Sequence, residues 1–313
     1  DNEKLIGSLT DGDVRRGLIK DITIDQPVDD IIQSNPKYIR KNDYELKKII
    51  EYRENNFRIL PILNKDDQII NVINFDDLKS YLPVDTVIMA GGQGTRLRPL
   101  TEDTPKPLLK VGEKPILEHN LHRLSQYGID DFWITVNYLG EQIENHFGNG
   151  NARNLQIEYV WEEKPLGTAG ALSKIDNFHH EYLLLTNSDL LTDLNYEDFF
   201  LTFCEEDADL AVVTIPYKVD VPYAVLETSN GHVVNFKEKP TYTYYSNAGI
   251  YLMKRKVVDY IPKEKFYDTT DLMEDLIDNG KKIFSYPHTG YWLDVGKQED
   301  FEKAQNDIQK LDI

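Results

Sequence analysis

Apolar positions follow two different spacings along most of this chain, and the two kinds of segment alternate. Short apolar runs of strand length fall at 87–90, 132–136, 157–161 and 182–186. Between them, apolar residues recur at helical spacing at 116–127 and 139–147, and Gly128 ends the first of these helices. Such alternation predicts an α/β fold with a mostly parallel, doubly wound sheet and helices on both faces.

The second half of the chain continues with strand patterns and closes with two helical ones. Strands are expected at 211–216, 224–228, 233–237 and 246–251. Asn230 and Gly231 lie between the second and third of these strands, and this pair favours a hairpin turn because both residues tolerate a left-handed backbone. Helices are expected at 271–279, followed by Gly280 as the stop, and at 298–310.

The first 83 residues consist of shorter alternating segments. Elements are expected at 4–9, 11–19, 28–33, 36–39, 43–55, 57–63, 69–74 and 76–81. The longest of them is a helix with one apolar side, formed by Leu46, Ile49 and Tyr52 among others. The junction at Pro83 is short and is not a long flexible linker. The sequence therefore predicts two domains, a small α+β domain at 1–83 and the doubly wound domain at 84–313.

Composition and charge narrow the classes of function. The 313 residues include 35 Lys and Arg against 54 Asp and Glu, which gives a net charge of -19. This balance speaks against a nucleic-acid partner but is compatible with a local basic pocket for a small anion. The chain contains no apolar run long enough to span a membrane and no recognisable leader, so neither a membrane partner nor export is expected. Cys204 is the single cysteine, which fits a cytoplasmic protein.

A glycine-rich loop follows the first apolar run of the larger domain. After Ala90 come Gly91, Gly92 and Gly94, and then Thr95. Glycines allow otherwise forbidden backbone dihedral angles and bring backbone N–H groups close to a ligand. The spacing is neither the dinucleotide-binding fingerprint nor the Walker loop, which needs Lys and Ser or Thr directly after its last glycine. The loop nevertheless suits a phosphate chain.

Cationic residues follow the loop at positions where the chain is stiff. Arg96 and Arg98 come first, and Lys106 is then flanked by Pro105 and Pro107, which restrict the backbone on either side. A planar guanidinium fork together with a held point charge suits a triphosphate. The alternative is a glycine-rich turn followed by solvated basic residues.

The segments 91–101 and 105–107 together resemble the signature of the sugar-1-phosphate nucleotidyltransferases and match it without a gap. The resemblance extends over 84–313 and implies a Rossmann-like nucleotidyltransferase sheet. It implies that the loop from Ala90 to Arg96 wraps a nucleoside triphosphate and that Arg96 holds the phosphates and assists the departure of pyrophosphate. Lys106 would stabilise charge where the sugar phosphate attacks. The implied products are a nucleotide-sugar and pyrophosphate.

Two aspartates are candidate magnesium ligands. Asp189 follows the buried strand 182–186, so it lies at the carboxyl end where a cation can be held against phosphate oxygens. Asp294 lies more than a hundred residues later, after a bulky apolar pair. Both match the metal-binding aspartates of the family, which implies Mg²⁺. The alternative is that each caps a helix, Asp294 the one at 298–310.

The base and the sugar have candidate partners as well. Glu162 or Glu163 could accept both N–H donors of a guanine edge, and the following Gly167 and Thr168 could pack against the base. The run 165–170 resembles that of guanylyltransferases, which makes GTP the expected substrate and mannose-1-phosphate or glucosamine-1-phosphate the expected type of sugar. The alternatives are two surface charges before a turn, or a uridylyl- or thymidylyltransferase of the same fold.

Four further residues match sugar-binding positions of the family. Glu238 and Lys239 belong to an E-K-P element whose glutamate contacts sugar hydroxyls and whose lysine contacts the sugar phosphate. Asn247 and Gly249 match a strand that lines the sugar, with the glycine leaving room and the amide offering a polar contact. The alternative is a charged hairpin end and an ordinary strand.

The first domain resembles cystathionine-β-synthase-type (CBS) repeats. Residues 7–16 look like the end of a first repeat that lacks its front half, and 28–81 look like a complete second one. The resemblance implies an adenine nucleotide bound by Thr10 and Asp13, although the same two residues could form a helix cap. A non-catalytic nucleotide sensor acting through these repeats is the rival function. A homo-oligomer is compatible with the sequence.

Overall fold

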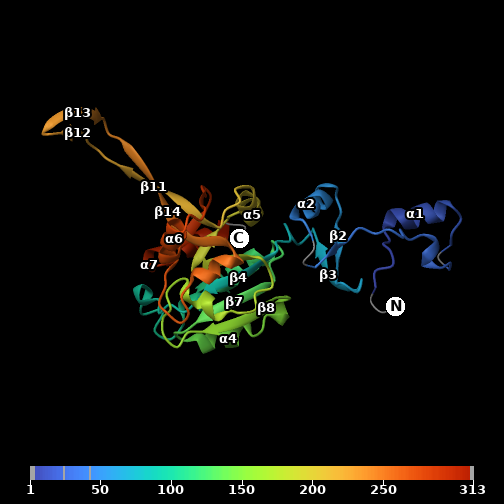
Figure 1. Ribbon diagram of the computed structural model, residues 1–313. Coiled ribbons are helices and arrows are strands. Elements are labelled where there is room, and N and C mark those ends of the chain that lie inside the picture. The colour runs from blue at the N-terminus through green and yellow to red at the C-terminus, as the bar shows by residue number, and fades with distance from the viewer. Residues whose placement is uncertain (1–3, 24, 42–43, 311–313) are drawn as a thin grey trace. The chain divides into compact units, whose positions relative to one another are not determined.

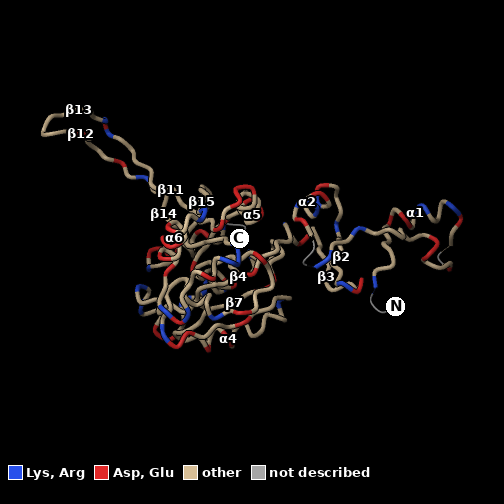
Figure 2. Tube along the Cα trace, in the orientation of Figure 1, with Lys and Arg blue, Asp and Glu red and all other residues tan. Residues whose placement is uncertain are grey.

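The computed structural model describes residues 4–23, 25–41 and 44–310, and it divides into two compact units at 1–81 and 82–313 (Figure 1). The start of the helix expected at 43–55 lies outside the described residues. Acidic and basic residues are interspersed along the trace of both units (Figure 2). Among the described residues, no helix has the length and apolar character needed to cross a membrane.

The first unit contains a three-stranded sheet. Its elements are α1 (Asp11–Ile19), a 3-10 turn (Val28–Asp30), β1 (Ile39–Arg40), α2 (Leu46–Glu54), β2 (Ile59–Leu63) and β3 (Ile69–Asn74). β1 and β2 are parallel, and β3 runs antiparallel to β2. Ile49 of α2, Leu60 of β2 and Ile73 of β3 are fully buried. The unit is therefore a small α+β arrangement, as the sequence predicts.

Two of the short elements expected in this unit do not form. Residues 75–77 form a turn and 78–81 have no regular secondary structure. The Asn74 side chain accepts from the backbone N–H of Asp76, and the backbone carbonyl of Asn74 accepts from Asp77 and Leu78. Residues 4–9 contribute only isolated bridges, from Lys4 and from Ser8.

The second unit is built on a seven-stranded sheet in the order β15-β11-β14-β9-β4-β7-β8. The strands are β4 (Val84–Met89), β7 (Asp131–Val136), β8 (Gln156–Trp161), β9 (Tyr182–Asn187), β11 (Leu210–Asp220), β14 (Thr241–Lys254) and β15 (Ile283–Pro287). β4 lies between β9 and β7 and is parallel to both, and β8 extends the parallel set. β14 alone runs antiparallel to its two neighbours. The prediction of a mostly parallel sheet is confirmed.

Helices and small sheets flank the central sheet. The helices are α3 (Ile116–Ser125), α4 (Gly140–Phe147), α5 (Tyr196–Glu205), α6 (Thr269–Asp278) and α7 (Gln298–Asp307). The small strand pairs are β5 (Lys110–Val111) with β6 (Lys114–Pro115) and β10 (Leu190–Thr192) with β16 (Trp292–Asp294). Gly128 and Gly280 have φ values of 71° and 67°, so both serve as the helix stops expected from the sequence.

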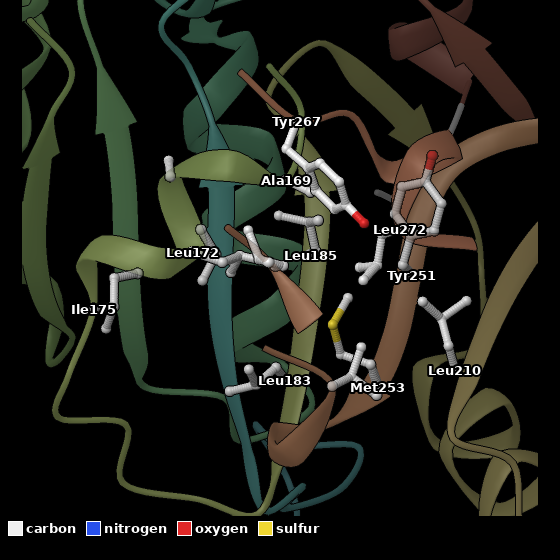
Figure 3. Packing of buried hydrophobic residues seen from close by; sticks show 14 of the residues in the cluster. Ala169, Leu172, Ile175, Leu183, Leu185, Leu210, Tyr251, Met253, Tyr267 and Leu272 are labelled. Atoms are coloured by element: carbon white, nitrogen blue, oxygen red, sulfur yellow. The ribbon is translucent and has the colours of Figure 1, made fainter. Parts of the chain in front are cut away.

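A large core cluster lies where strands of the sheet meet the 3-10 helix Gly170–Lys174 and α6. Figure 3 shows Leu183 and Leu185 of β9 beside Tyr251 and Met253 of β14, with Leu272 of α6 against them. These side chains are almost entirely buried. At about 25 cal/mol per Å² of apolar surface, burial of this kind supplies the main stabilisation of the unit.

A two-stranded ribbon extends from the sheet. β11 and β14 remain paired as far as Asp220 and Thr241, and β12 (Val225–Ser229) and β13 (His232–Lys237) continue the ribbon to its tip. Asn230 and Gly231 at the tip have φ values of 49° and 82°, which confirms the hairpin turn. Figure 1 shows this ribbon projecting away from the rest of its unit.

Candidate active site

A cleft of about 650 Å³ lies at the carboxyl ends of β4 and β9. It is lined by the loop 89–96 after β4, by residues 187–189 after β9, and by Lys106, Glu162 and Thr168 among others. Parallel sheets of this kind bind ligands beyond the carboxyl ends of their strands. The sheet therefore brings the glycine loop and Asp189 to one place, although they are almost a hundred residues apart.

The glycine loop is held in shape by its own contacts. Gly94 has a φ of 60°, and a Cβ atom there would lie 3.0 Å from the Thr101 side chain and 3.2 Å from that of Lys106. The Thr101 hydroxyl also donates to the Gly94 carbonyl at 2.8 Å. A Cβ on Gly92, in contrast, would meet nothing within 4 Å. The loop is therefore anchored at Gly94 and open at Gly92, where a ligand can approach the backbone.

Lys106 lies between two carboxylates. Its side chain is 11% exposed, and its Nζ donates to Asp189 and lies 3.8 Å from Oδ1 of Asp294. A Cβ atom built on Gly296 would lie 3.4 Å from both carboxylate oxygens of Asp294 and 3.5 Å from the Arg96 guanidinium. Arg96 therefore lies near the Asp294 carboxylate. Two cationic side chains and two carboxylates therefore meet beside the glycine loop.

The two aspartates are brought together by the small sheet of β10 and β16. Leu190 pairs with Asp294 in this sheet, and the backbone N–H of Val295 donates to the carbonyl of Asp189 at 2.9 Å. The helix-cap alternative for Asp294 is wrong, since the N-cap of α7 is Lys297. The pairing of two distant segments is what places both carboxylates at Lys106.

The donor set of this pair fits a hard divalent cation. Oδ1 of Asp189 and Oδ1 of Asp294 are buried, and neither atom has a hydrogen-bond partner in the part of the chain that the structure describes. Burial, and next the neighbouring Asp189 carboxylate, raise the pKa of Asp294 to about 6, while Lys106 and Arg96 oppose this shift. Carboxylate oxygens that lack donors and repel each other are suited to a shared Mg²⁺.

Glu162 occupies the cleft, whereas Glu163 is exposed and does not line it. Glu162 is 8% exposed, and its Oε2 accepts from the backbone N–H of Leu166 at 2.8 Å. Its Oε1 would lie 3.3 Å from a Cβ on Gly91. The Asn137 amide donates to the Glu162 backbone carbonyl at 2.5 Å. Of the two predicted acids, the structure brings only Glu162 to the glycine loop.

Gly167 and Thr168 form the opposite wall of the cleft with Asp268. Gly167 has a φ of 78°, and a Cβ there would lie 2.7 Å from the Tyr267 carbonyl, so the position requires glycine. Asp268 accepts from the backbone N–H of Thr168 at 2.9 Å and from its hydroxyl at 3.1 Å. The wall therefore has a fixed backbone.

Asn137, Phe266 and Asp268 are among the cleft residues that escaped the sequence analysis. Asn137 directly follows β7, so its place at the carboxyl edge of the sheet could have been recognised. Asp268 is the N-cap of α6, and a helix cap in the sequence gives no indication that the residue lies near Thr168. Phe266 is 62% exposed, and no sequence signal points to it.

The predicted sugar-binding residues are only partly brought together. Gly249 has a φ of 74°, and a Cβ there would lie 2.6 Å from the Asn187 amide, so Gly249 adjoins the cleft. The Asn247 amide donates to the Tyr251 hydroxyl at 2.6 Å, and its oxygen accepts from Gly249. Glu238 and Lys239 lie between β13 and β14 on the projecting ribbon, and they are not among the described residues that line the cleft (Figure 1).

Thr10 and Asp13 form a capping box at the start of α1. The Asp13 carboxylate accepts from the backbone and side chain of Thr10, from Arg16 and from Gln33. The pKa of Asp13 lies far below its usual value. The hydrogen bond from the Thr10 hydroxyl lowers it most, and the hydrogen bond from the Gln33 amide is the next largest cause. These contacts account for both residues as a helix cap, and a nucleotide at this place stays a prediction.

Residues 85–311 match the family model described as nucleotidyl transferase. A UTP–glucose-1-phosphate uridylyltransferase of Synechocystis is 32% identical over 72% of this chain and 64% of its own length. A mannose-1-phosphate guanylyltransferase of Mycobacterium tuberculosis is 35% identical over the same two shares, 72% and 64%. A D-glycero-alpha-D-manno-heptose 1-phosphate guanylyltransferase of Aneurinibacillus thermoaerophilus is 30% identical over 72% of this chain and 99% of its own length.

This chain thus spans about two thirds of the first two of these relatives, 64% of each, and nearly the whole of the third. The match to the family model begins at the second residue of β4 and takes in the cleft, from the glycine loop to Asp294. The chain therefore belongs to the nucleotidyl transferase family.

Proposed function

We propose that this protein is a sugar-1-phosphate nucleotidyltransferase, which converts a nucleoside triphosphate and a hexose-1-phosphate into a nucleotide-sugar and pyrophosphate. The observation that carries the proposal is the meeting of Lys106, Asp189 and Asp294 beside the glycine loop. The glycine loop offers backbone N–H groups to the phosphates, and the cationic side chains face the position where charge would develop.

The reaction needs positioning and charge neutralisation and no covalent intermediate. An oxygen of the sugar phosphate attacks the α-phosphorus of the triphosphate and forms the new P–O bond. The bond from the α-phosphorus to the bridging oxygen of the β-phosphate breaks, and pyrophosphate leaves with that electron pair. Lys106 neutralises charge on the α-phosphate oxygens, and Arg96 holds the phosphates that leave.

Asp189 and Asp294 would hold Mg²⁺ in this proposal, since each offers a buried carboxylate oxygen without a hydrogen-bond partner. The ion would supply Lewis-acid neutralisation of phosphate charge. With substrate absent, Lys106 compensates both carboxylates. Binding of the triphosphate would give Lys106 phosphate oxygens as competing acceptors.

GTP is the triphosphate we favour. Glu162 lies in the cleft near the glycine loop, and a carboxylate accepts the two adjacent N–H groups of guanine better than the single N–H of uracil or thymine. The named relatives include two guanylyltransferases and one uridylyltransferase, so a uridylyl- or thymidylyltransferase is the alternative. The expected sugar is of the mannose- or glucosamine-1-phosphate type, bound beside Asn247 and Gly249, with Glu238 and Lys239 as further predicted contacts.

The test is pyrophosphate release by the full chain with Mg²⁺, measured across GTP, UTP, dTTP and ATP and a panel of hexose-1-phosphates. The proposal expects a strong signal with GTP and one sugar phosphate. A preference for UTP or dTTP would overturn the base assignment alone. Folded protein that binds nucleotide but releases no pyrophosphate with any pair would favour the non-catalytic sensor.

We also propose that 1–83 is a CBS-type domain with a truncated first repeat, that 84–313 is the transferase domain, and that the protein is cytoplasmic. The order β1, α2, β2, β3 and the capped helix α1 support the first assignment. An adenine nucleotide at Thr10 and Asp13 would then be the regulatory ligand. Calorimetric titration of the full chain with AMP and ATP tests it, because Thr10→Ala should weaken binding. Equal binding by the variant, or none by either protein, would contradict it.

A further inference from the structure

A second cluster of ionisable groups lies at the amino-terminal edge of the central sheet, opposite the cleft. Asp85 belongs to β4, Asp131 is the first residue of β7, and His179 and His180 come shortly before β9. β4 pairs in parallel with both β7 and β9, which brings these strand starts side by side. β4 itself separates the cluster from the glycine loop, by on the order of 15 Å at about 3.3 Å per residue.

His180 holds both carboxylates of this cluster. Its backbone N–H donates to Oδ2 of Asp85 at 2.8 Å, and its ring Nε2 lies 3.4 Å from Oδ2 of Asp131. Oδ1 of Asp131 lies 3.2 Å from Nδ1 of His179. The His179 ring in turn packs against Trp133, with 5.4 Å between the ring centroids. The side chains are therefore oriented by their neighbours.

One acceptor in the cluster lacks a donor. Asp85 is 0% exposed, and its buried Oδ1 atom has no hydrogen-bond partner among the described residues. A buried carboxylate oxygen without a donor has lost its contacts with water and gained none in their place, which is destabilising. One oxygen of Asp85, one of Asp131 and one ring nitrogen of His179 all lie within 4.8 Å of one another. A cation placed among these atoms would satisfy them together.

The ligand chemistry indicates which ion fits. Mg²⁺ and Ca²⁺ prefer oxygen ligands alone, whereas an imidazole nitrogen with two carboxylates suits Zn²⁺ and related transition ions. Zn–N and Zn–O bonds are about 2.0–2.2 Å, so neighbouring ligand atoms in a tetrahedral site are about 3.3 Å apart. The 3.2 Å between Asp131 Oδ1 and His179 Nδ1 matches such an edge.

We propose that Asp85, Asp131 and His179 bind a divalent transition-metal ion of the Zn²⁺ type, with His180 orienting the two carboxylates. The ion fastens the starts of β4, β7 and β9 to one another. Because it lies at the edge of the sheet opposite the cleft, it stabilises the unit and takes no part in the reaction proposed above. The inference is therefore independent of the proposed function.

The test uses the full chain stripped with a chelator and kept in excess Mg²⁺, so that the cleft carboxylates are occupied. Calorimetric titration with Zn²⁺ should give one site, and Co²⁺ should produce the visible absorption of a tetrahedral complex. Thermal unfolding should shift upward by roughly 5 °C or more when Zn²⁺ reaches about 100 times its Kd. His179→Ala and Asp85→Asn should each weaken Zn²⁺ binding at least 10-fold.

His146→Ala is the matched control. The His146 ring is 39% exposed and lies 3.7 Å from Glu118, much as the His179 ring is 38% exposed and lies 3.2 Å from Asp131. This variant should keep wild-type Zn²⁺ affinity. Equal Zn²⁺ affinity in all four proteins, or no thermal shift in the wild type, would overturn the proposal. A loss in Asp85→Asn without a loss in His179→Ala would overturn the ligand set.

Discussion

Each of the two edges of the central sheet holds two aspartate carboxylates, but the groups that contact these carboxylates differ between the edges. At the carboxyl edge, the side chain of Lys106 lies between Asp189 and Asp294. At the amino edge, Asp131 contacts two imidazoles instead, and Asp85 keeps one oxygen without a donor. An ammonium group can neutralise carboxylates and then engage a phosphate, whereas an imidazole nitrogen can serve as a ligand to a metal ion. The nature of the compensating group thus separates a candidate reaction site from a candidate structural site.

Removing both carboxylates of the carboxyl edge should have the largest effect of the changes considered, a loss of pyrophosphate release. The double variant Asp189→Asn plus Asp294→Asn is expected to lower pyrophosphate release by about 10²–10³ or more, since it removes both predicted metal ligands. Each single variant should lose nearly as much as the double, because the two act as a unit. Steady-state rates over a range of Mg²⁺ concentrations measure this. Strictly additive losses would argue against a shared ion.

Two glycines of the loop offer a smaller, matched contrast. Gly94→Ala should lower the free energy of unfolding by about 1–2 kcal/mol, because a side chain at φ of 60° is strained and the Cβ approaches Thr101. Gly92→Ala should be close to neutral for stability, since nothing lies within 4 Å of its Cβ, yet it should weaken triphosphate binding. Denaturant unfolding and nucleotide titration measure the two effects. Equal stability losses would contradict the distinction between the anchored and the open end.

The smallest expected effect is a pH dependence at the carboxyl edge. The pKa of Asp294 is raised to about 6, mainly by burial, so the folded state favours its protonated form. A raised acid pKa contributes stability that is complete at low pH and is lost as pH rises through about 6. The unfolding temperature of metal-free protein should therefore fall between about pH 5 and pH 7, by roughly 2–4 °C. Asp294→Asn should flatten this slope, and an unchanged slope would refute the assignment.

Much of the carboxyl edge could be predicted from sequence. Apolar runs of strand length located β4 and β9, and the residues directly after two neighbouring parallel strands must lie at one edge of the sheet. The sequence places the glycine loop and Asp189 each at the carboxyl end of a strand, and the pairing of β4 with β9 brings them together. The contact of Asp294 with Lys106 depends on the pairing of β10 with β16, which no local pattern reveals.

The amino edge could not be predicted, because Asp85 and Asp131 are buried in the first residues of two strands and the two histidines lie outside the strands. The apolar run of β4 suggested a start at 87, whereas the strand begins at Val84 and includes the fully buried Asp85 and Thr86. A buried acid interrupts the hydrophobic pattern by which a strand is recognised. Its partners come from two other strand starts, so the cluster exists only in three dimensions.

The ribbon and α5 show a different limit. The strand patterns near 211–216 and 246–251 were recognised, but the pairing that extends β11 to Asp220 and carries Glu238 and Lys239 away from the cleft depends on register. Helix α5 was missed, although Asn195 caps it and Phe199 and Phe203 face the core. Local patterns identify elements, while tertiary pairing decides where their side chains lie.

The most direct measurement compares pyrophosphate release by Lys106→Ala and His179→Ala, each against the wild type, at saturating Mg²⁺ and substrates. Lys110→Ala, an exposed lysine four positions away in β5, controls for loss of a lysine. If the reaction belongs to the carboxyl edge alone, Lys106→Ala loses about 10²–10³ in turnover while His179→Ala and Lys110→Ala keep the wild-type rate. Near-normal turnover in Lys106→Ala, or an equal loss in His179→Ala, would contradict the account.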